Sequence, residues 1–343
     1  MMVNRGKKGV ARLSTKAKIL MALREQTGKT VSGSKLASDL GISRVGVWKG
    51  IQSLITAGYL IKTNDTGYFL DPARTNDFLY PWEFGEKEPM FRFFENTAST
   101  MDNVRDFASQ GHAAGTVAVA ETQSAGRGRN GRTWASRQGG LYCSFLDRPA
   151  LSLADYCMPA MLYQIAVARA VGSICGKPAK LRWPNDIYIG GRKIAGIITE
   201  LEAEGDMISW IATGIGVNVN NLSPSAKAVS CCEITRRTVS RRTLLISIIN
   251  EADRLKKSAG STIAYTQGSR YLAAEWNSLA DSIGAKTAIV DSVNTSQEPK
   301  GRLLARGVFE GIDPAGRCIV KPHNNGETLY FNPGPVSMMF LQN

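Results

Sequence analysis

The stretch Arg182–Gly196, RWPNDIYIGGRKIAG, decides the fold of the central part of this 343-residue chain. Two β-prone runs flank Gly190-Gly191, a pair that favours a tight two-residue turn, so the stretch predicts an antiparallel hairpin. Pairing across that turn places Tyr188 opposite Lys193, which makes Lys193 and Asp186 diagonal neighbours on one face, about 7 to 8 Å apart at the backbone. An amine and a carboxylate could therefore converge on one ligand. From the pair alone, a surface salt bridge on a hairpin is an equally good interpretation.

The sequence around the hairpin alternates strand-like and helical runs. Helices are predicted over 102–110 and 154–175. Strands are predicted over 116–121, 140–146, 180–182, 187–189, 194–201 and 209–219. Because the hairpin is antiparallel, we expect a mixed α/β domain with a largely antiparallel sheet.

A second informative stretch, Gly126–Trp134, has the sequence GRGRNGRTW. Its three glycines let the backbone approach a ligand closely, and its three arginines supply guanidinium groups that bind anions. An RGG-like RNA-binding segment is the alternative, but this is a single copy between β-prone runs and it ends in a tryptophan that can pack. Together with the Lys193 and Asp186 pair, this Gly-Arg loop is suited to activating a carboxylic acid with a nucleotide.

Composition limits the class of protein. With 43% hydrophobic residues the chain can form two or three domains with their own cores. It has no run of 18 consecutive apolar residues, and no apolar segment follows its basic N-terminus, so we expect a cytoplasmic protein without a membrane partner. The six cysteines form no CxxC pair and there are two histidines, which indicates reduced, partly buried thiols and neither a disulfide framework nor a zinc site.

Residues 1–72 predict a winged helix-turn-helix domain. Ser14 or Thr15 can cap a first helix, Ser34 precedes a short second helix, and Ser43 caps a third whose apolar positions repeat at helical spacing. Two β-prone runs follow, at 59–61 and 68–70, joined by a polar tip. This order of elements is typical of DNA-binding proteins.

The third helix of such a domain enters the major groove of DNA. The candidate DNA contacts are the polar outward side chains of this helix and one lysine of the wing: Arg44, Lys49, Gln52 and Lys62. Residues 1–75 hold 13 Lys and Arg against four acidic residues, in a chain of net charge +13, which favours a polyanionic partner over a protein-docking role. Trp48 on the same side could lie on DNA, on a neighbouring domain or on a dimer partner.

The segment over 73–90 mixes proline, glycine, acidic and aromatic residues without periodicity, and predicts a linker or a packed connector. The catalytic domain should then cover 91–282, with helices over 242–256 and 267–279 near its end. A small β-domain is expected over 283–343, with strands at 288–291, 303–312, 318–322 and 327–331. The polar stretch 292–300 within it predicts a mobile loop.

Four motifs occur in the order and spacing of biotin protein ligases: Gly126–Trp134, Trp183–Asp186, Lys193–Gly196 and Gly214–Asn218. The chain resembles that family over nearly its whole length, and its N-terminal domain resembles the bifunctional class, which is both ligase and repressor of biotin synthesis. The resemblance implies an α+β protein in which a winged helix-turn-helix precedes a class II synthetase-like ligase domain and a C-terminal SH3-like β-barrel. Biotin and ATP would first give biotinyl-5′-AMP and pyrophosphate. The biotinyl group would then pass to a lysine of a biotin carboxyl carrier protein.

The resemblance also implies roles for individual residues. Lys193 matches the catalytic lysine and Asp186 the aspartate that orients or deprotonates the acceptor lysine, while Trp134 would stack on adenine. The biotin-binding residues would be Ser99, Thr100, Gln123, Arg127, Arg129 and Gly196. The adenylate- and ATP-binding residues would be Gly126, Gly128, Arg129, Gly131, Arg132, Trp134, Asn185, Lys193 and Asn218. Arg182 stands where many members of the family have a lysine, which leaves the role of that cation open.

Elementary chemistry agrees with these roles. Attack of a carboxylate on an α-phosphate brings two anions together, so positive charge from Lys193, Arg127 and the Mg²⁺ on ATP is needed in the transition state. The transfer step needs a neutral amine, and Asp186 is the nearest plausible carboxylate. The resemblance further implies operator DNA of the biotin synthesis genes as a partner, and a homodimer that forms when ligand binds.

Two other functions remain open. The chain could be a biotin-sensing transcription factor without catalytic activity, although a sensor would not need Lys193, Asp186 and the full Gly-Arg loop. It could also be a lipoate or octanoyl protein ligase, which has a similar core but usually lacks the winged helix. Comparison of biotin with lipoate as the acid substrate separates these ligases.

Overall fold

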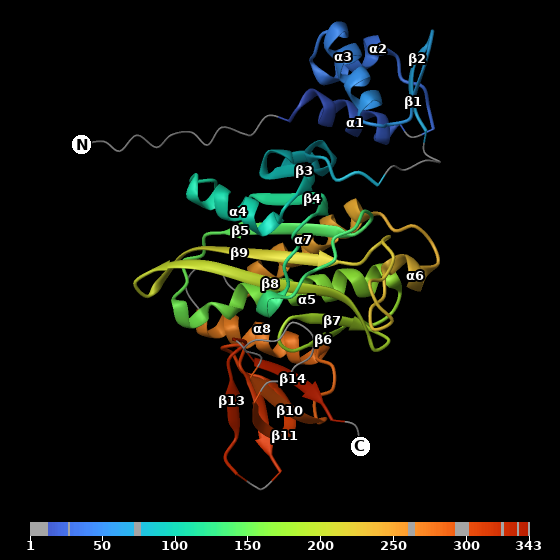
Figure 1. Cartoon of the computed structure of the whole chain (residues 1–343). Helices are drawn as coiled ribbons and strands as arrows, with labels where there is room; N and C mark the ends of the chain where they lie inside the picture. Colours follow the sequence, from blue (N-terminus) through green and yellow to red (C-terminus); the bar gives the residue numbers. More distant parts are fainter. Residues whose placement is uncertain are drawn as a thin grey trace, which may run out of the picture. The chain divides into compact units, whose positions relative to one another are not determined.

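The computed structural model describes residues 13–26, 28–71, 77–259, 265–291, 302–323, 326–334 and 336–341, with the side chains of 265–267 left aside (Figure 1). The chain divides into two compact units, 1–93 and 94–343. The stretch 292–300, predicted as a mobile loop, and the basic residues before Leu13 lie outside the described residues.

The N-terminal unit has the element order of a winged helix-turn-helix: α1 (Thr15–Glu25), α2 (Gly33–Leu40), α3 (Arg44–Thr56), β1 (Ile61–Asn64) and β2 (Gly67–Leu70). A serine hydroxyl caps each helix by accepting a backbone N–H, as Ser14 and Ser43 were predicted to do. The prediction for α2 was wrong by two residues, because Ser32 is the cap and Ser34 lies inside the helix. The wing also differs, since β1 extends to Asn64 and therefore includes Lys62, which was expected in the tip.

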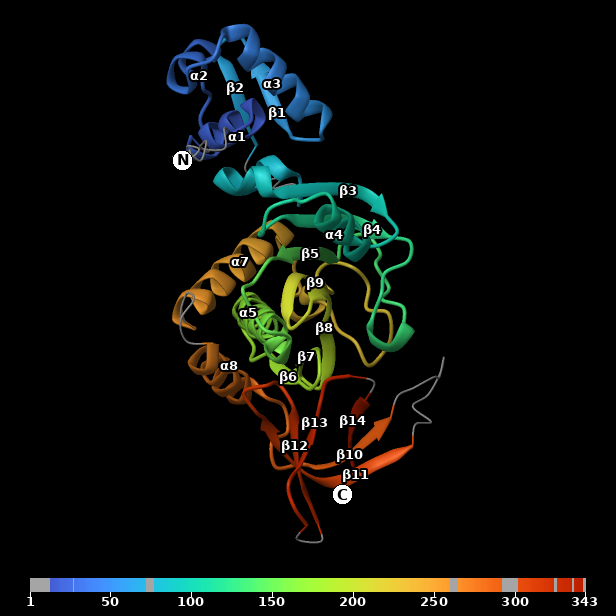
Figure 2. The same ribbon diagram turned by 90° about the vertical axis from the view of Figure 1, so that its left-hand side faces the viewer.

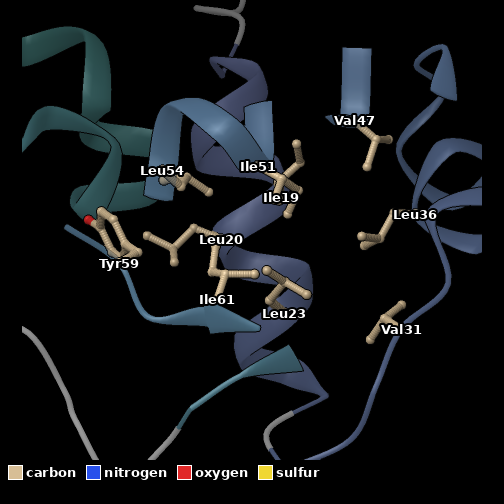
Figure 3. Packing of buried hydrophobic residues seen from close by; sticks show 10 residues of the cluster. All are labelled: Ile19, Leu20, Leu23, Val31, Leu36, Val47, Ile51, Leu54, Tyr59 and Ile61. Carbon is tan, nitrogen blue, oxygen red and sulfur yellow. The ribbon is translucent and has the colours of Figure 1, made fainter. Parts of the chain in front are cut away.

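The core of this unit joins all three helices to the wing. Figure 3 shows its buried side chains, which come from the three helices, from β1 and from the segments that precede α2 and β1: Ile19, Leu20, Leu23, Val31, Leu36, Val47, Ile51, Leu54, Tyr59 and Ile61. Phe78, Tyr80 and Trp82 pack on the same core. They precede or begin a segment of 3-10 turns, η1 (Pro81–Met90). The end of this unit is therefore packed against the helices.

The second unit is a mixed α/β structure that contains one main sheet. The described strands of its main sheet lie in the order β3 (Phe91–Thr97), β4 (Val117–Gln123), β5 (Leu141–Asp147), β9 (Met207–Val217), β8 (Arg192–Glu204), β7 (Asp186–Ile189) and β6 (Lys180–Arg182). All pairings from β4 to β6 are antiparallel, which confirms the expected sheet type.

Helices cover both faces of this sheet (Figure 2). The helices of this unit are α4 (Thr100–Ser109), α5 (Cys157–Cys175), α6 (Cys231–Thr235), α7 (Arg241–Ser258) and α8 (Tyr265–Leu279). Met101 of α4 contacts the Gly214 side of the sheet, whereas Tyr163 of α5 stacks on Phe145, which points to the other side. Among the described helices α5 is long and apolar enough to cross a membrane, but its buried position identifies it as a core helix. All six cysteines are free, and five of them are buried.

The C-terminal strands form a separate antiparallel sheet in the order β13 (Leu329–Phe331), β12 (Cys318–Pro322), β11 (Leu303–Ile312), β10 (Lys286–Asp291) and β14 (Val336–Phe340). The described strands leave β13 and β14 as unpaired edges, so this sheet is open rather than the closed barrel that was expected. Sequence patterning located the other four strands and missed β14, as it also missed β3 and α6.

Candidate active site

The predicted hairpin places an amine beside a carboxylate. Strands β7 and β8 pair Tyr188 with Lys193 and Ile189 with Arg192, which is the predicted register. The Lys193 Nζ atom lies 2.6 Å from Asp186 Oδ1, and both side chains are half-buried. They face a cavity of about 670 Å³, so the pair is part of a binding site and not a salt bridge on an open surface.

The cavity carries a strong excess of positive charge. Its cationic lining residues come from the Gly-Arg loop, β6, β8 and the segment after β9: Arg127, Arg129, Arg132, Arg182, Lys193 and Lys227. Among the described lining residues, Asp186 supplies the one carboxylate. Such a lining attracts polyanionic ligands, a triphosphate among them, because several fixed cations act together in a partly desolvated space.

At the centre of the cavity, two glycines paired across β8 and β9 leave room for an aromatic ring to lie on the sheet. Gly196 of β8 lies opposite Gly216 of β9, and the Trp134 ring packs on both. A Cβ at Gly216 would come within 2.5 Å of the ring, so a larger residue would push the tryptophan away. Lys193 Nζ lies 5.3 Å from the centre of the same ring, and the buried indole N–H has no hydrogen-bond partner within the described residues.

The Gly-Arg loop folds back on itself above this floor. The Trp134 N–H donates to the Gly126 carbonyl at 2.9 Å, and the Gly128 N–H donates to the Arg132 carbonyl at 2.7 Å. Gly131 needs its lack of a side chain because its φ is +72°. The backbone of the loop is therefore ordered, and its arginine side chains extend from a defined turn.

Arg129 connects the loop to two other segments. Its guanidinium donates to the Asn185 side-chain oxygen at 3.4 Å and to the carbonyls of Pro333, at 3.1 Å, and Gly334. Burial lowers the pKa of Arg129 from its ordinary value. The loop, the WPND motif and the segment between β13 and β14 thus meet at one side chain.

Arg127 is held by carboxylates. Its guanidinium lies 2.9 Å from Asp102 of α4 and 3.2 Å from Glu200 of β8. Arg105 bridges the same two carboxylates. The positive charge of Arg127 is therefore partly compensated in this structure. Arg127 lines the first cavity and also a second one, of about 920 Å³, which shares most of the Gly-Arg loop as its lining.

A neutral polar network forms the end of the first cavity near α4. Gln123 Oε1 accepts from the Thr100 N–H at 2.8 Å, and Gln123 Nε2 donates to Ser136 Oγ at 2.7 Å. The Thr100 hydroxyl lies 2.8 Å from that of Ser144. Ser99 caps α4. Ser99, Thr100 and Gln123 were predicted site residues, whereas no sequence signal marks Ser136 and Ser144, which contact Gln123 and Thr100.

Gly126 and Gly131, both predicted to bind the adenylate, line the second cavity and are absent from the described lining of the first. Two further residues have informative surroundings. Asn218 lies outside the cavity lining, and its side-chain oxygen accepts from Asn221 at 3.0 Å. Arg182 does line the cavity, but its Nε donates to Asp281 at 3.1 Å and its guanidinium packs on the rings of Tyr188 and Phe340. The position therefore serves as a link to the C-terminal sheet.

No residue of the C-terminal sheet was predicted to belong to the site. The structure places one strand of this sheet, β14, against the cavity, through Ser337, Met338, Met339 and Phe340. No motif marks this strand, because its contribution follows from tertiary packing alone.

The DNA-contact candidates lie on the surface of the N-terminal unit. Arg44 and Lys49 are exposed on α3 and Gln52 is partly exposed, all away from the core. Lys62 lies in the wing, 3.6 Å from Asp71.

Comparison with known proteins gives consistent matches for both units. Residues 93–218 match the biotin/lipoate A/B protein ligase family, and residues 15–69 match a helix-turn-helix domain. The chain is 35% identical to the bifunctional ligase/repressor BirA of Bacillus spizizenii over 219 residues, which are 61% of this chain and 67% of that protein. It is 31% identical to the biotin–[acetyl-CoA-carboxylase] ligase of Paracoccus denitrificans, over 59% of this chain and 82% of that one.

A longer match extends through both units. The bifunctional ligase/repressor BirA of Escherichia coli is 26% identical over 316 residues, which are 88% of this chain and 92% of that protein. The fold is similar to that of the biotin protein ligase from Aquifex aeolicus solved with biotin and ATP, with a TM-score of 0.58 and 23% identity, covering 73% of this chain and 99% of that one.

Proposed function

The chain belongs to the biotin protein ligase family, in the class that carries a DNA-binding helix-turn-helix domain, and from this membership we propose how its own residues perform the reaction. The observation that carries the proposal is the Lys193 and Asp186 pair, at 2.6 Å, in a cavity whose other charged lining residues are cations. This is the environment that a carboxylate and a triphosphate need in order to approach each other.

In the first step the biotin carboxylate attacks the α-phosphate of ATP and pyrophosphate leaves. Lys193 neutralises the charge that develops between the two anions, and the cations of the Gly-Arg loop hold the remaining phosphates. The polar network of Thr100 and Gln123 would bind the uncharged ring end of biotin, where neutral donors and acceptors suffice. The unpartnered Trp134 N–H is a further donor for the ligand.

In the second step the lysine of a biotin carboxyl carrier protein attacks the mixed anhydride and AMP leaves. Asp186 is placed to orient this amine or accept its proton. Mg²⁺ would enter on ATP, since the described residues contain no group of three ligands for a metal and Asp186 is the one carboxylate in the cavity lining. The positive charge of this ion would assist the departure of pyrophosphate.

We further propose that the N-terminal unit binds operator DNA of the biotin synthesis genes, as a homodimer promoted by the bound adenylate, in the cytoplasm. The basic surface of α3 supports the DNA contact. The C-terminal sheet would correspond to the family's SH3-like domain, and its antiparallel order supports that assignment.

Biotin-dependent exchange of labelled pyrophosphate into ATP tests the first step, with lipoate as the parallel acid. We expect exchange with biotin and none with lipoate. Exchange with lipoate alone would identify a lipoate ligase. A protein that binds biotin without exchange would be an inactive sensor.

A further inference from the structure

Helix α3 presents two apolar side chains that neither the core nor the ligase chemistry uses. Val45 is 62% exposed and Trp48 is 53% exposed. They are three residues apart, so they are neighbours on the helix surface. The core side of the same helix is formed by Val47, Ile51 and Leu54, which are fully buried, so the exposed pair is not part of the packing of this unit.

The pair lies among polar groups suited to nucleic acid. Lys49 follows Val45 by four residues and Gln52 follows Trp48 by four, so all four side chains share one side of α3. Lys49 is exposed and makes no ion pair with the residues that the structure describes. A surface that combines unpaired positive charge with an apolar contact fits the major groove, where phosphates flank the edges of the bases.

The wing offers less positive charge. Lys62 is paired with Asp71, and Asp65 is exposed at the tip of the hairpin. Contact with bases therefore rests on α3, in the position where helix-turn-helix proteins place their recognition helix.

We propose that Val45 and Trp48 contact the 5-methyl groups of thymines in the major groove. Thymine is the base that presents a methyl group there, and apolar side chains recognise it. The base preference of the N-terminal unit would then depend on burial of thymine methyl groups as well as on hydrogen bonds. This inference rests on the proposed DNA-binding function of the N-terminal unit.

The test compares two duplexes that differ in those methyl groups alone. Fluorescence anisotropy would measure binding of the full-length protein, with biotin and MgATP, to a labelled alternating A·T duplex and to the same duplex with deoxyuridine in place of thymidine. We expect weaker binding to the deoxyuridine duplex, by roughly fourfold for each methyl group contacted, because burial of one such group contributes about 0.8 kcal/mol.

Variants connect this preference to the two side chains. The double variant Val45→Ala/Trp48→Ala should bind both duplexes equally, and its melting temperature should be that of the wild type because both side chains are exposed. Lys49→Ala is the matched control on the same side of α3. It should bind both duplexes more weakly while the ratio between them stays as in the wild type.

Other outcomes would overturn the inference. Equal binding of the wild-type protein to both duplexes, or an unchanged ratio in the double variant, would contradict thymine contact while leaving DNA binding intact. If Trp48→Ala changes the oligomeric state on size exclusion and not this ratio, the pair belongs to a protein interface. If neither duplex binds at low salt, the DNA-binding function itself fails.

Discussion

At the scale of single residues, the contact between Lys193 and Asp186 allows the two half-reactions to be separated. Lys193→Ala should lower biotin-dependent pyrophosphate exchange by at least about 10²-fold, the usual effect of removing a group that stabilises developing charge. Asp186→Asn keeps the lysine and should retain exchange within about tenfold, yet lose transfer to the carrier lysine. Both are measured with labelled pyrophosphate and with a purified carrier domain.

Lys227→Ala is the matched control, since Lys227 lines the same cavity and its backbone carbonyl, which the substitution keeps, accepts the Lys193 N–H. We expect it to raise the KM for ATP with a smaller effect on kcat. Equal losses in Lys193→Ala and Lys227→Ala, or full activity of a folded Lys193→Ala protein, would contradict the specific role of Lys193.

The charged half of this site could be predicted from the sequence because its residues lie within short contiguous motifs. Two glycines between β-prone runs place Tyr188 opposite Lys193, and Asp186 shares the face of Tyr188 because it is two residues away. A register shift between Ile187 and Tyr188, which the sequence did not predict, then places Gly196 opposite Asp186. The other half could not be predicted. Ser136 contacts Gln123 across a β-bridge, and Ser144 of β5 contacts Thr100 of α4, so both contacts join residues distant in sequence. Serines are too common in sequences to be a signal.

At the scale of elements, α3 depends on a glycine where helices usually disfavour one. A Cβ at Gly50 would lie 2.4 Å from Ile19 Cδ1, so the absence of a side chain lets α3 approach α1. Alanine normally stabilises a helix by about 1 kcal/mol relative to glycine. Here overpacking should outweigh that gain, and Gly50→Ala should destabilise the N-terminal unit by roughly 1 to 3 kcal/mol. Hydrogen exchange of the α1 and α3 amides in the full-length protein measures this change.

The double variant Gly50→Ala/Ile19→Val removes the clashing Cδ1 atom and should recover part of the loss, although Ile19→Val alone should cost about 0.5 to 1.5 kcal/mol. Gly46→Ala is the control within the same helix, since its Cβ would come no closer than 3.3 Å to a neighbour. If Gly50→Ala is as stable as Gly46→Ala, the close approach of the two helices is wrong.

Elements with strong local signals were predicted well, and those defined by tertiary pairing were missed. The spacing of apolar residues located α4, α5, α7 and α8. The strands β3 and β14 have weak sequence patterns, and each forms as an edge strand by pairing with a strand distant in sequence, β4 and β10 respectively. For α2, Ser32 and Ser34 are both good caps in isolation, and the choice between them depends on where Leu36 packs.

At the scale of the whole molecule, charge separates the two functions. Residues 1–75 account for a net charge of +9 out of +13, while the longer remainder is nearly balanced overall and places six cations in the lining of one cavity. In the proposed function, DNA binding and adenylate formation would use different sets of basic residues, so we expect that each set can be changed without the other.

Substitution of the exposed cations of α3 should test this separation. In Arg44→Ala/Lys49→Ala the affinity for duplex DNA should fall, and the slope of log affinity against log salt should decrease by about two, since each phosphate contact contributes about 0.9 to that slope. Biotin-dependent pyrophosphate exchange should stay at the wild-type rate. Lys35→Ala, on α2 and already paired with Asp39, should leave the slope nearly unchanged. An unaltered slope in the double variant would show that α3 does not make the DNA contact. A loss of pyrophosphate exchange would mean that the N-terminal unit contributes directly to catalysis.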